Sequence, residues 1–124
     1  MDAVPQAREA KKKELLSELA ELMIEEQVEA GVFLGTPHYS VIELAAMNLG
    51  RQLSRESQER GAREVAAGSG AEADCPTCTT ACRVETQARG VTSMDGAVDL
   101  TEAVAHCRKC RRSFFPSAGS NGAG

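Results

Sequence analysis

Apolar residues in the first half of the chain recur with the period of an α-helix. The aliphatic residues between Lys11 and Glu26 come three or four positions apart, which is the pattern of one face of a helix. Pro5 suits the first turn of that helix, where its missing N–H would be unpaired anyway. Gly31 suits the position just after the helix ends. These signals predict the first helix of a helical hairpin over residues 1–66.

A start signal and a second periodic run predict the other helix of the hairpin. Ser40 and Glu43 have the spacing of a capping box, in which each side chain accepts the backbone N–H of the other residue. Apolar positions follow at helical spacing as far as Leu53. Beyond Leu53 charged residues of opposite sign lie four apart, and we expect them to form ion pairs on a solvated extension.

The second half of the chain changes character. Residues 67–74 are small and polar, which predicts a linker. Residues 75–116 contain turn and strand signals and predict a small β-hairpin module. The last eight residues, 117–124, offer nothing to bury and are expected to be disordered. The predicted fold class is therefore α+β.

The hairpin is expected to turn at Asp95-Gly96, a pair favoured at the two central positions of a tight turn. The strands then lie near residues 82–93 and 97–106. This centring places Arg89 opposite Glu102, a charge-compatible pair. It also places Glu85 opposite His106, Val91 opposite Leu100 and Val84 opposite Cys107, while Gly90 is a candidate for a bulge.

Composition and charge exclude several classes of protein. The chain has three Phe, one Tyr and no Trp, so a large aromatic core is excluded. Residues 1–70 carry eight Lys or Arg and twelve Asp or Glu, and residues 71–124 carry six of each. A globally basic nucleic-acid binder is excluded, although a local basic patch remains open. No secretion signal or run long enough to span a bilayer is present, so we expect a cytoplasmic protein without a membrane segment.

All five cysteines fall between Cys75 and Cys110. Two C-x2-C pairs, Cys75 with Cys78 and Cys107 with Cys110, are separated by 28 residues. Each pair brings two thiolates to one side of a turn, and a hairpin between the pairs can join them into one tetrahedral site. Such a site is closed to water and substrate. The sequence therefore predicts a structural metal site and a module that unfolds in strong chelator, because about 40 residues rarely fold without such support.

Zinc is the expected metal. A rubredoxin-type iron site uses nearly the same spacing but usually sits over an aromatic core, and no aromatic residue lies between these pairs. A thioredoxin-like redox role is disfavoured because neither pair begins a helix after a strand. Cys82 is either a small apolar side chain at the start of a strand or a replacement ligand. His106 adjoins a predicted ligand but is expected on the opposite face of its strand.

Four cationic residues surround the last cysteine: Arg108, Lys109, Arg111 and Arg112. They can offset the charge of −2 that four thiolates and one Zn²⁺ would carry. They can also contact the phosphates of a nucleic acid. The two interpretations are compatible.

The cysteine-containing segment CPTC…CRVETQARGVTSMDGAVDLTEAVAHCRKCRRSFFP resembles the N-terminal zinc-ribbon region of a group of bacterial insertion-sequence transposases, the Kra type. The upstream segment PHYSVIELAAMNLGRQLSRE is similar to the helical part that precedes the ribbon in that group. The resemblance covers about residues 36–116. The matching positions are Cys75, Pro76, Cys78, Arg83, Thr92, Gly96, Val98, Cys107, Cys110, Phe114, Phe115 and Pro116, although Thr92 sits one residue further from Gly96 than the family pattern asks. The glycine that often follows the first pair is Thr79 here.

The resemblance implies a DNA-binding or targeting region that recognises the ends of a mobile element. The family's catalytic domain would follow Pro116, so no residue here inherits a catalytic role and no enzyme activity is expected. The chain would then be a truncated or split reading frame, or the targeting module alone. The alternative is a zinc-stabilised interaction module in which the helical hairpin pairs with a second copy. Rubredoxin-like electron transfer is the third hypothesis.

Overall fold

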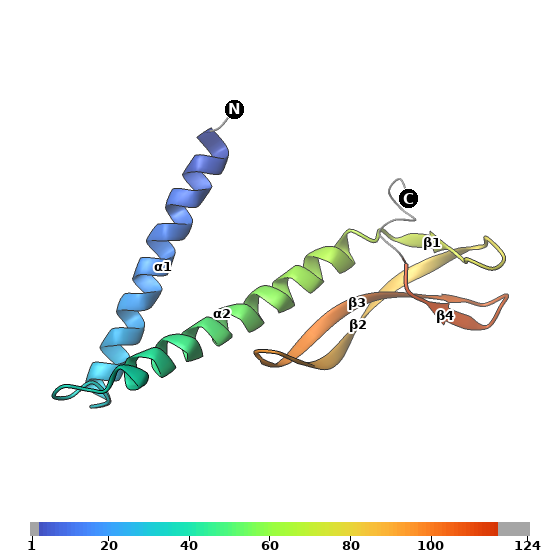
Figure 1. Cartoon of the computed structure of the whole chain (residues 1–124). Coiled ribbons are helices and arrows are strands. Elements are labelled where there is room, and N and C mark those ends of the chain that lie inside the picture. The colour runs from blue at the N-terminus through green and yellow to red at the C-terminus, as the bar shows by residue number, and fades with distance from the viewer. Residues whose placement is uncertain (1–2, 117–124) are drawn as a thin grey trace. The chain divides into compact units, whose positions relative to one another are not determined.

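The computed structural model describes residues 3–116, and the predicted disordered tail, 117–124, lies outside them. Two helices, α1 (Ala3–Glu29) and α2 (Tyr39–Ala67), precede four strands: β1 (Glu72–Asp74), β2 (Ala81–Ser93), β3 (Gly96–Cys107) and β4 (Arg112–Phe114). The strands form one antiparallel sheet in the order β1-β2-β3-β4 (Figure 1). The α+β fold class is therefore confirmed. The chain divides into two units, and the boundary in the sequence lies between Arg51 and Gln52.

Helix α1 ends as its sequence predicts. Gly31 has a φ of 80°, a left-handed conformation that glycine adopts without steric cost. The N–H of Gly31 donates to the carbonyl of Val28, and the N–H of Val32 donates to that of Gln27. This pair of bonds is a Schellman motif, which satisfies carbonyls that the helix end leaves open.

The start of α2 differs from the prediction. Helix α2 begins at Tyr39, and the N–H of Ser40 donates to His38 Nδ1 at 3.2 Å. His38 therefore takes the N-cap position, and its ring accepts a helix N–H that a Ser or Asp oxygen usually accepts. The predicted capping box between Ser40 and Glu43 is wrong, because the Ser40 N–H is already committed to His38.

The β2–β3 hairpin has a register two residues from the expected one. Arg89 pairs with Leu100, Val84 with Ala105 and Ser93 with Gly96. The predicted cross-strand pairs are therefore wrong, including those of Glu85 with His106 and Val91 with Leu100. A shift of two residues keeps every side chain on its expected face. Arg89 Nε accordingly still reaches Glu102 Oε1 at 2.7 Å, as a diagonal neighbour.

The turn itself explains the shift. Gly96 has a φ of 116°, whereas Asp95 is not among the non-glycine residues with positive φ. The glycine thus follows the turn instead of occupying its second central position, as in hairpins that end in a left-handed glycine. The Ser93 hydroxyl donates to the Gly96 carbonyl at 2.7 Å and accepts the Asp95 N–H at 3.2 Å. Ser93 thereby closes the turn one position earlier on each strand.

Two further details of the sheet differ from the sequence-based expectation. Gly90 pairs with Asp99 inside an unbroken ladder, so the expected bulge is absent. The segment predicted as a linker contains β1, which pairs with the start of β2 from Glu72 opposite Arg83. Ala73 is buried in this pairing. Backbone pairing needs no large side chain, so the small residues of this segment form a strand despite their composition.

The second part of α2 holds the hairpin turn through polar contacts. Ser54 Oγ donates to Asp95 Oδ2 at 2.6 Å, and Arg55 Nη1 donates to the Asp95 carbonyl at 2.8 Å. One turn further along, Gln58 donates to Ser93 Oγ, and Glu59 accepts the N–H of Asp99 at 2.9 Å. The predicted solvated extension is thus partly a docking surface. Of its expected ion pairs, Arg60 with Glu56 forms at 2.7 Å.

The core is small and lies around the cysteines. Cys75, Cys82, Ala105 and Cys107 form one buried cluster, with Val84 and Phe114 packed against it. By contrast, no residue of α1 is buried. Within the described residues, neither helix combines the length and the apolar character needed to cross a membrane.

The contact between Ser54 and Asp95 can be tested by substitution. Replacing Asp95 with Ala removes a partly buried hydrogen bond to a carboxylate, so we expect a loss of about 1 kcal/mol in unfolding free energy. The measurement is urea unfolding of the metal-loaded protein. Asp99→Ala is the matched control, because the described contact of Asp99 with α2 uses its backbone N–H. An equal loss in both variants would contradict the assignment.

Candidate metal centre

The two predicted knuckles meet at one end of the sheet. The first, Cys75 to Cys78, lies in the connection between β1 and β2, and the second, Cys107 to Cys110, joins β3 to β4. Because β2 pairs with β3 and β3 with β4, the sheet brings residues far apart in sequence to the same place. The ligand atoms of Cys75, Cys78, Cys107 and Cys110 all lie within 4.8 Å of one another.

The sulfur distances match a tetrahedral site. Cys75 Sγ lies 3.8 Å from Cys110 Sγ, and Cys78 Sγ lies 3.5 Å from Cys107 Sγ. Four sulfurs at a Zn–S bond length of about 2.3 Å are separated by about 3.8 Å in a regular tetrahedron. A disulfide needs about 2.05 Å, and all five cysteines are free thiols. The group can therefore hold a metal ion.

In each knuckle a backbone N–H donates to the sulfur of the first cysteine. The N–H of Thr77 donates to Cys75 Sγ, and the N–H of Cys110 donates to Cys107 Sγ, both at 3.4 Å. The residue after each knuckle has a left-handed backbone conformation: Thr79 has a φ of 62° and Arg111 a φ of 57°. These are the only non-glycine residues with positive φ in the described part of the chain. The turn therefore requires the conformation that the more usual glycine would supply.

Thiol acidity differs sharply within the cluster. The Thr80 hydroxyl lies 3.2 Å from Cys78 Sγ, and its hydrogen bond to the ionised sulfur lowers the pKa of Cys78 to about 6. Backbone N–H groups of Cys78 and Thr77 lower the pKa of Cys75. The contact with the Cys78 thiol and burial raise the pKa of Cys110 to about 12. Ionisation of one thiol raises the pKa of its neighbours, because adjacent thiolates repel one another. A bound divalent cation offsets these negative charges.

Cys82 lies in the core and outside the four-sulfur group. Its side chain is only 5% exposed, and its Sγ donates to the Thr80 carbonyl at 3.2 Å. Burial raises the pKa of Cys82, so this thiol stays protonated. His106 also lies outside the group. Its ring is exposed and contacts Ser113 Oγ at 3.2 Å.

The four cationic residues predicted to contact nucleic acid are all exposed around the second knuckle. They are Arg108, Lys109, Arg111 and Arg112. Arg112 has a structural contact as well, since its Nη2 donates to Thr77 Oγ1 at 2.8 Å. This bond joins the second knuckle to the first. The sequence offered no signal for it, because the two residues are 35 positions apart.

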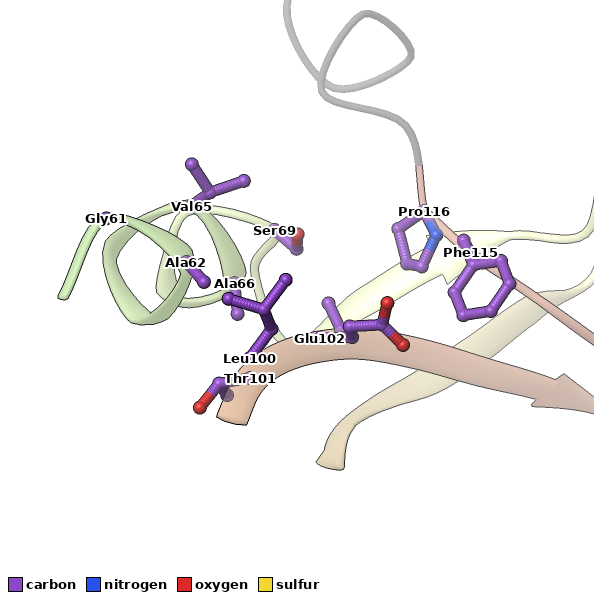
Figure 2. Close-up of a pocket in the computed structure, with 11 residues that line it drawn as sticks. Gly61, Ala62, Val65, Ala66, Ser69, Leu100, Thr101, Glu102, Phe115 and Pro116 are labelled. Atoms are coloured by element: carbon purple, nitrogen blue, oxygen red, sulfur yellow. The ribbon is translucent and has the colours of Figure 1, made fainter. Parts of the chain in front are cut away.

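A groove of about 380 Å³ lies elsewhere, between the end of α2 and β3. Figure 2 shows Leu100 and Glu102 rising from β3, with Phe115 and Pro116 on the far side. Glu102 Oε1 accepts from Arg89, whereas the buried Oε2 has no hydrogen-bond partner in the described part of the chain. No cysteine lines this groove, so it is separate from the metal centre.

Comparison with protein-family models, curated proteins and solved structures found no match to this chain.

Metal content and chelation test the centre. We expect one metal ion per chain by elemental mass spectrometry, and loss of the sheet's circular dichroism when chelator removes it, because the binding energy of a structural metal is folding energy. Cys107→Ser should abolish stoichiometric binding. Cys82→Ala is the matched control and should retain the ion. Retention of native circular dichroism after complete metal removal would contradict a structural role.

Thr79 offers a test of the knuckle geometry. A left-handed conformation costs a non-glycine residue about 1–2 kcal/mol, so Thr79→Gly should stabilise the metal-loaded protein by about 1 kcal/mol after the added chain entropy is subtracted. Thermal unfolding measures the change. Thr80→Gly is the control and should destabilise, since Thr80 lacks a positive φ and its hydroxyl contacts Cys78. Destabilisation by Thr79→Gly would argue against backbone strain.

Proposed function

We propose that the chain is a zinc-ribbon DNA-binding or targeting region of an insertion-sequence transposase of the Kra type, acting in the cytoplasm by binding and not by catalysis. The observation that carries the proposal is the position of four exposed cations around the second knuckle of a four-cysteine site. The transposase assignment rests on the resemblance of residues 36–116. The closed donor set supports a structural metal, because four protein ligands leave no position for a substrate.

Zinc is the proposed metal on the chemistry of the donors. Four thiolates in a tetrahedral arrangement suit zinc or iron. The aromatic packing typical of an iron site is absent from the described cluster, whose aromatic member is Phe114 alone. A colourless metal-loaded protein supports zinc, and a red one supports the rubredoxin-like alternative.

The cationic residues favour the phosphate backbone as their target. A protein that neutralises phosphates releases counterions, so its affinity falls with salt in proportion to the number of contacts. The exposed side chains of Arg108 and Lys109 have no acidic partner within the described residues. They are available to contact phosphates, whereas one N–H of Arg112 already donates to Thr77 Oγ1.

Salt dependence is the decisive measurement. With zinc loaded, a labelled mixed-sequence DNA duplex should bind, and Arg108→Ala with Lys109→Ala should weaken binding and reduce the slope of log affinity against log salt by roughly two. Fluorescence anisotropy over a salt series gives the slope. Arg8→Ala with Lys11→Ala, on α1, removes the same charge and should leave the slope unchanged. Absence of binding at low salt would overturn the proposal.

A further inference from the structure

Helix α1 carries apolar side chains that the described residues of its own unit, 3–51, leave largely exposed. It is 27 residues long and has no buried residue. Leu15, Leu16 and Leu22 are each about half exposed, at 47%, 52% and 57%. Most of the stability of helices in proteins comes from packing of an apolar face and not from helix propensity. The exposed leucines therefore identify a surface that has no partner within its own unit.

The apolar side chains form a short seam with a heptad spacing. Leu15 and Leu22 are seven residues apart, as are Leu16 and Met23, and Leu19 lies at the centre. Leu19 and Met23 are partly buried, whereas the other three are exposed. This is the spacing with which two helices pack along a common stripe. Lys12 and Glu26 continue the stripe, one seven residues before Leu19 and the other seven residues after it. The apolar positions of the seam are thus symmetrical about Leu19. The two ends of the seam carry opposite charges, from Lys12 and from Glu26.

The charges of α1 run against the helix dipole. Residues 3–16 carry four Lys or Arg and two Glu, whereas residues 17–29 carry five Glu and no cation. Negative charge is unfavourable at a helix C-terminus, and the last turn of α1 contains no basic residue. Glu25 and Glu26 have no cationic partner within the described residues. A positive surface placed along the second half of α1 would relieve this.

We infer that α1 is a homodimerisation surface, on which two copies pair antiparallel about Leu19. In this register Leu19 meets its own equivalent, Leu16 meets Leu22, and Leu15 meets Met23. At each end Lys12 of one copy faces Glu26 of the other, and Lys13 faces Glu25. The contact is isologous, which means that both copies use the same surface. The assembly therefore stops at a two-fold dimer.

Charge complementarity selects a second copy, in antiparallel orientation, as the occupant. A parallel pair would place Lys12 against Lys12 and Glu26 against Glu26, which is destabilising. An antiparallel pair opposes the two helix dipoles and makes every end contact attractive. The inference does not depend on DNA binding or on the identity of the metal, since α1 lies outside the cysteine module.

A charge exchange tests orientation and register together in the full-length, metal-loaded protein. Lys12→Glu places two like-charged pairs in its homodimer, and so does Glu26→Lys. We expect each variant alone to dissociate roughly ten times more readily than the wild type by sedimentation equilibrium, given ordinary surface-pair energies at two sites. An equimolar mixture contains only attractive pairs and should recover wild-type affinity as a heterodimer.

A disulfide at the two-fold axis provides a second readout. Leu19→Cys should form a cross-linked dimer under mild oxidation, because each new thiol meets its own equivalent. Ser17→Cys is the matched control, since residue 17 lies about 200° around the helix from residue 19. It should cross-link no more than the wild type, which reports the background from the native cysteines.

The outcomes separate the alternatives. A monomeric wild type at micromolar concentration would overturn the inference. A dimer that cross-links at residue 19 but whose two charge variants each dissociate no more readily than the wild type would show parallel pairing, because a parallel wild-type pair already contains two like-charged pairs. That result would overturn the inference equally. Equal cross-linking through residues 17 and 19 would indicate random collision. Recovery by mixing, together with selective cross-linking at residue 19, supports the antiparallel pair.

Discussion

The cysteine module depends on one geometric requirement, which is that four sulfurs separated by up to 35 positions meet within a single coordination sphere. The β2–β3 hairpin meets it by returning the chain to the start of β2, and β1 and β4 pair on either side of that end. Few large apolar side chains assist, because the buried cluster consists of three cysteines and one alanine. A core this small supplies little hydrophobic stabilisation. A metal ion held by the four sulfurs would add the folding energy that this core does not supply.

Closure of the site also accounts for its local strain. A knuckle must turn sharply enough to direct two thiols and two N–H groups toward the same point, and this requires a left-handed residue directly after it. Thr79 and Arg111 hold that conformation without being glycine. The Arg112–Thr77 bond ties the two knuckles together close to Arg111. Strain of this kind persists only where surrounding contacts fix the backbone, so the two knuckles support each other's geometry.

The sequence predicted the parts of the fold whose signals are local and periodic. The Schellman end of α1 followed from Gly31, and the four-cysteine cluster followed from the spacing of its pairs. The register prediction failed because Ser93 closes the hairpin before the Asp-Gly pair, through hydrogen bonds to Gly96 and Asp95 that the residue pattern does not reveal. The N-cap failed because a histidine nitrogen replaced the serine oxygen that the capping rule expects. The docking of α2 onto the turn was not predictable, since Ser54 and Asp95 have no pattern that relates them.

The two helices show two different ways of attaching a helix. The second part of α2 is polar, yet it is held, because Ser54, Arg55, Gln58 and Glu59 find specific donors and acceptors at the turn. Such contacts contribute little individually but define one arrangement. Helix α1 has the opposite character: it presents leucines and separated blocks of charge, and within the described residues of its own unit it meets no complementary surface. Burial of apolar area is non-directional, so charge must select the partner. A helix whose charge blocks are reversed about its own centre is complementary to itself, and in the proposed dimer this property ties the stability of α1 to the concentration of the protein.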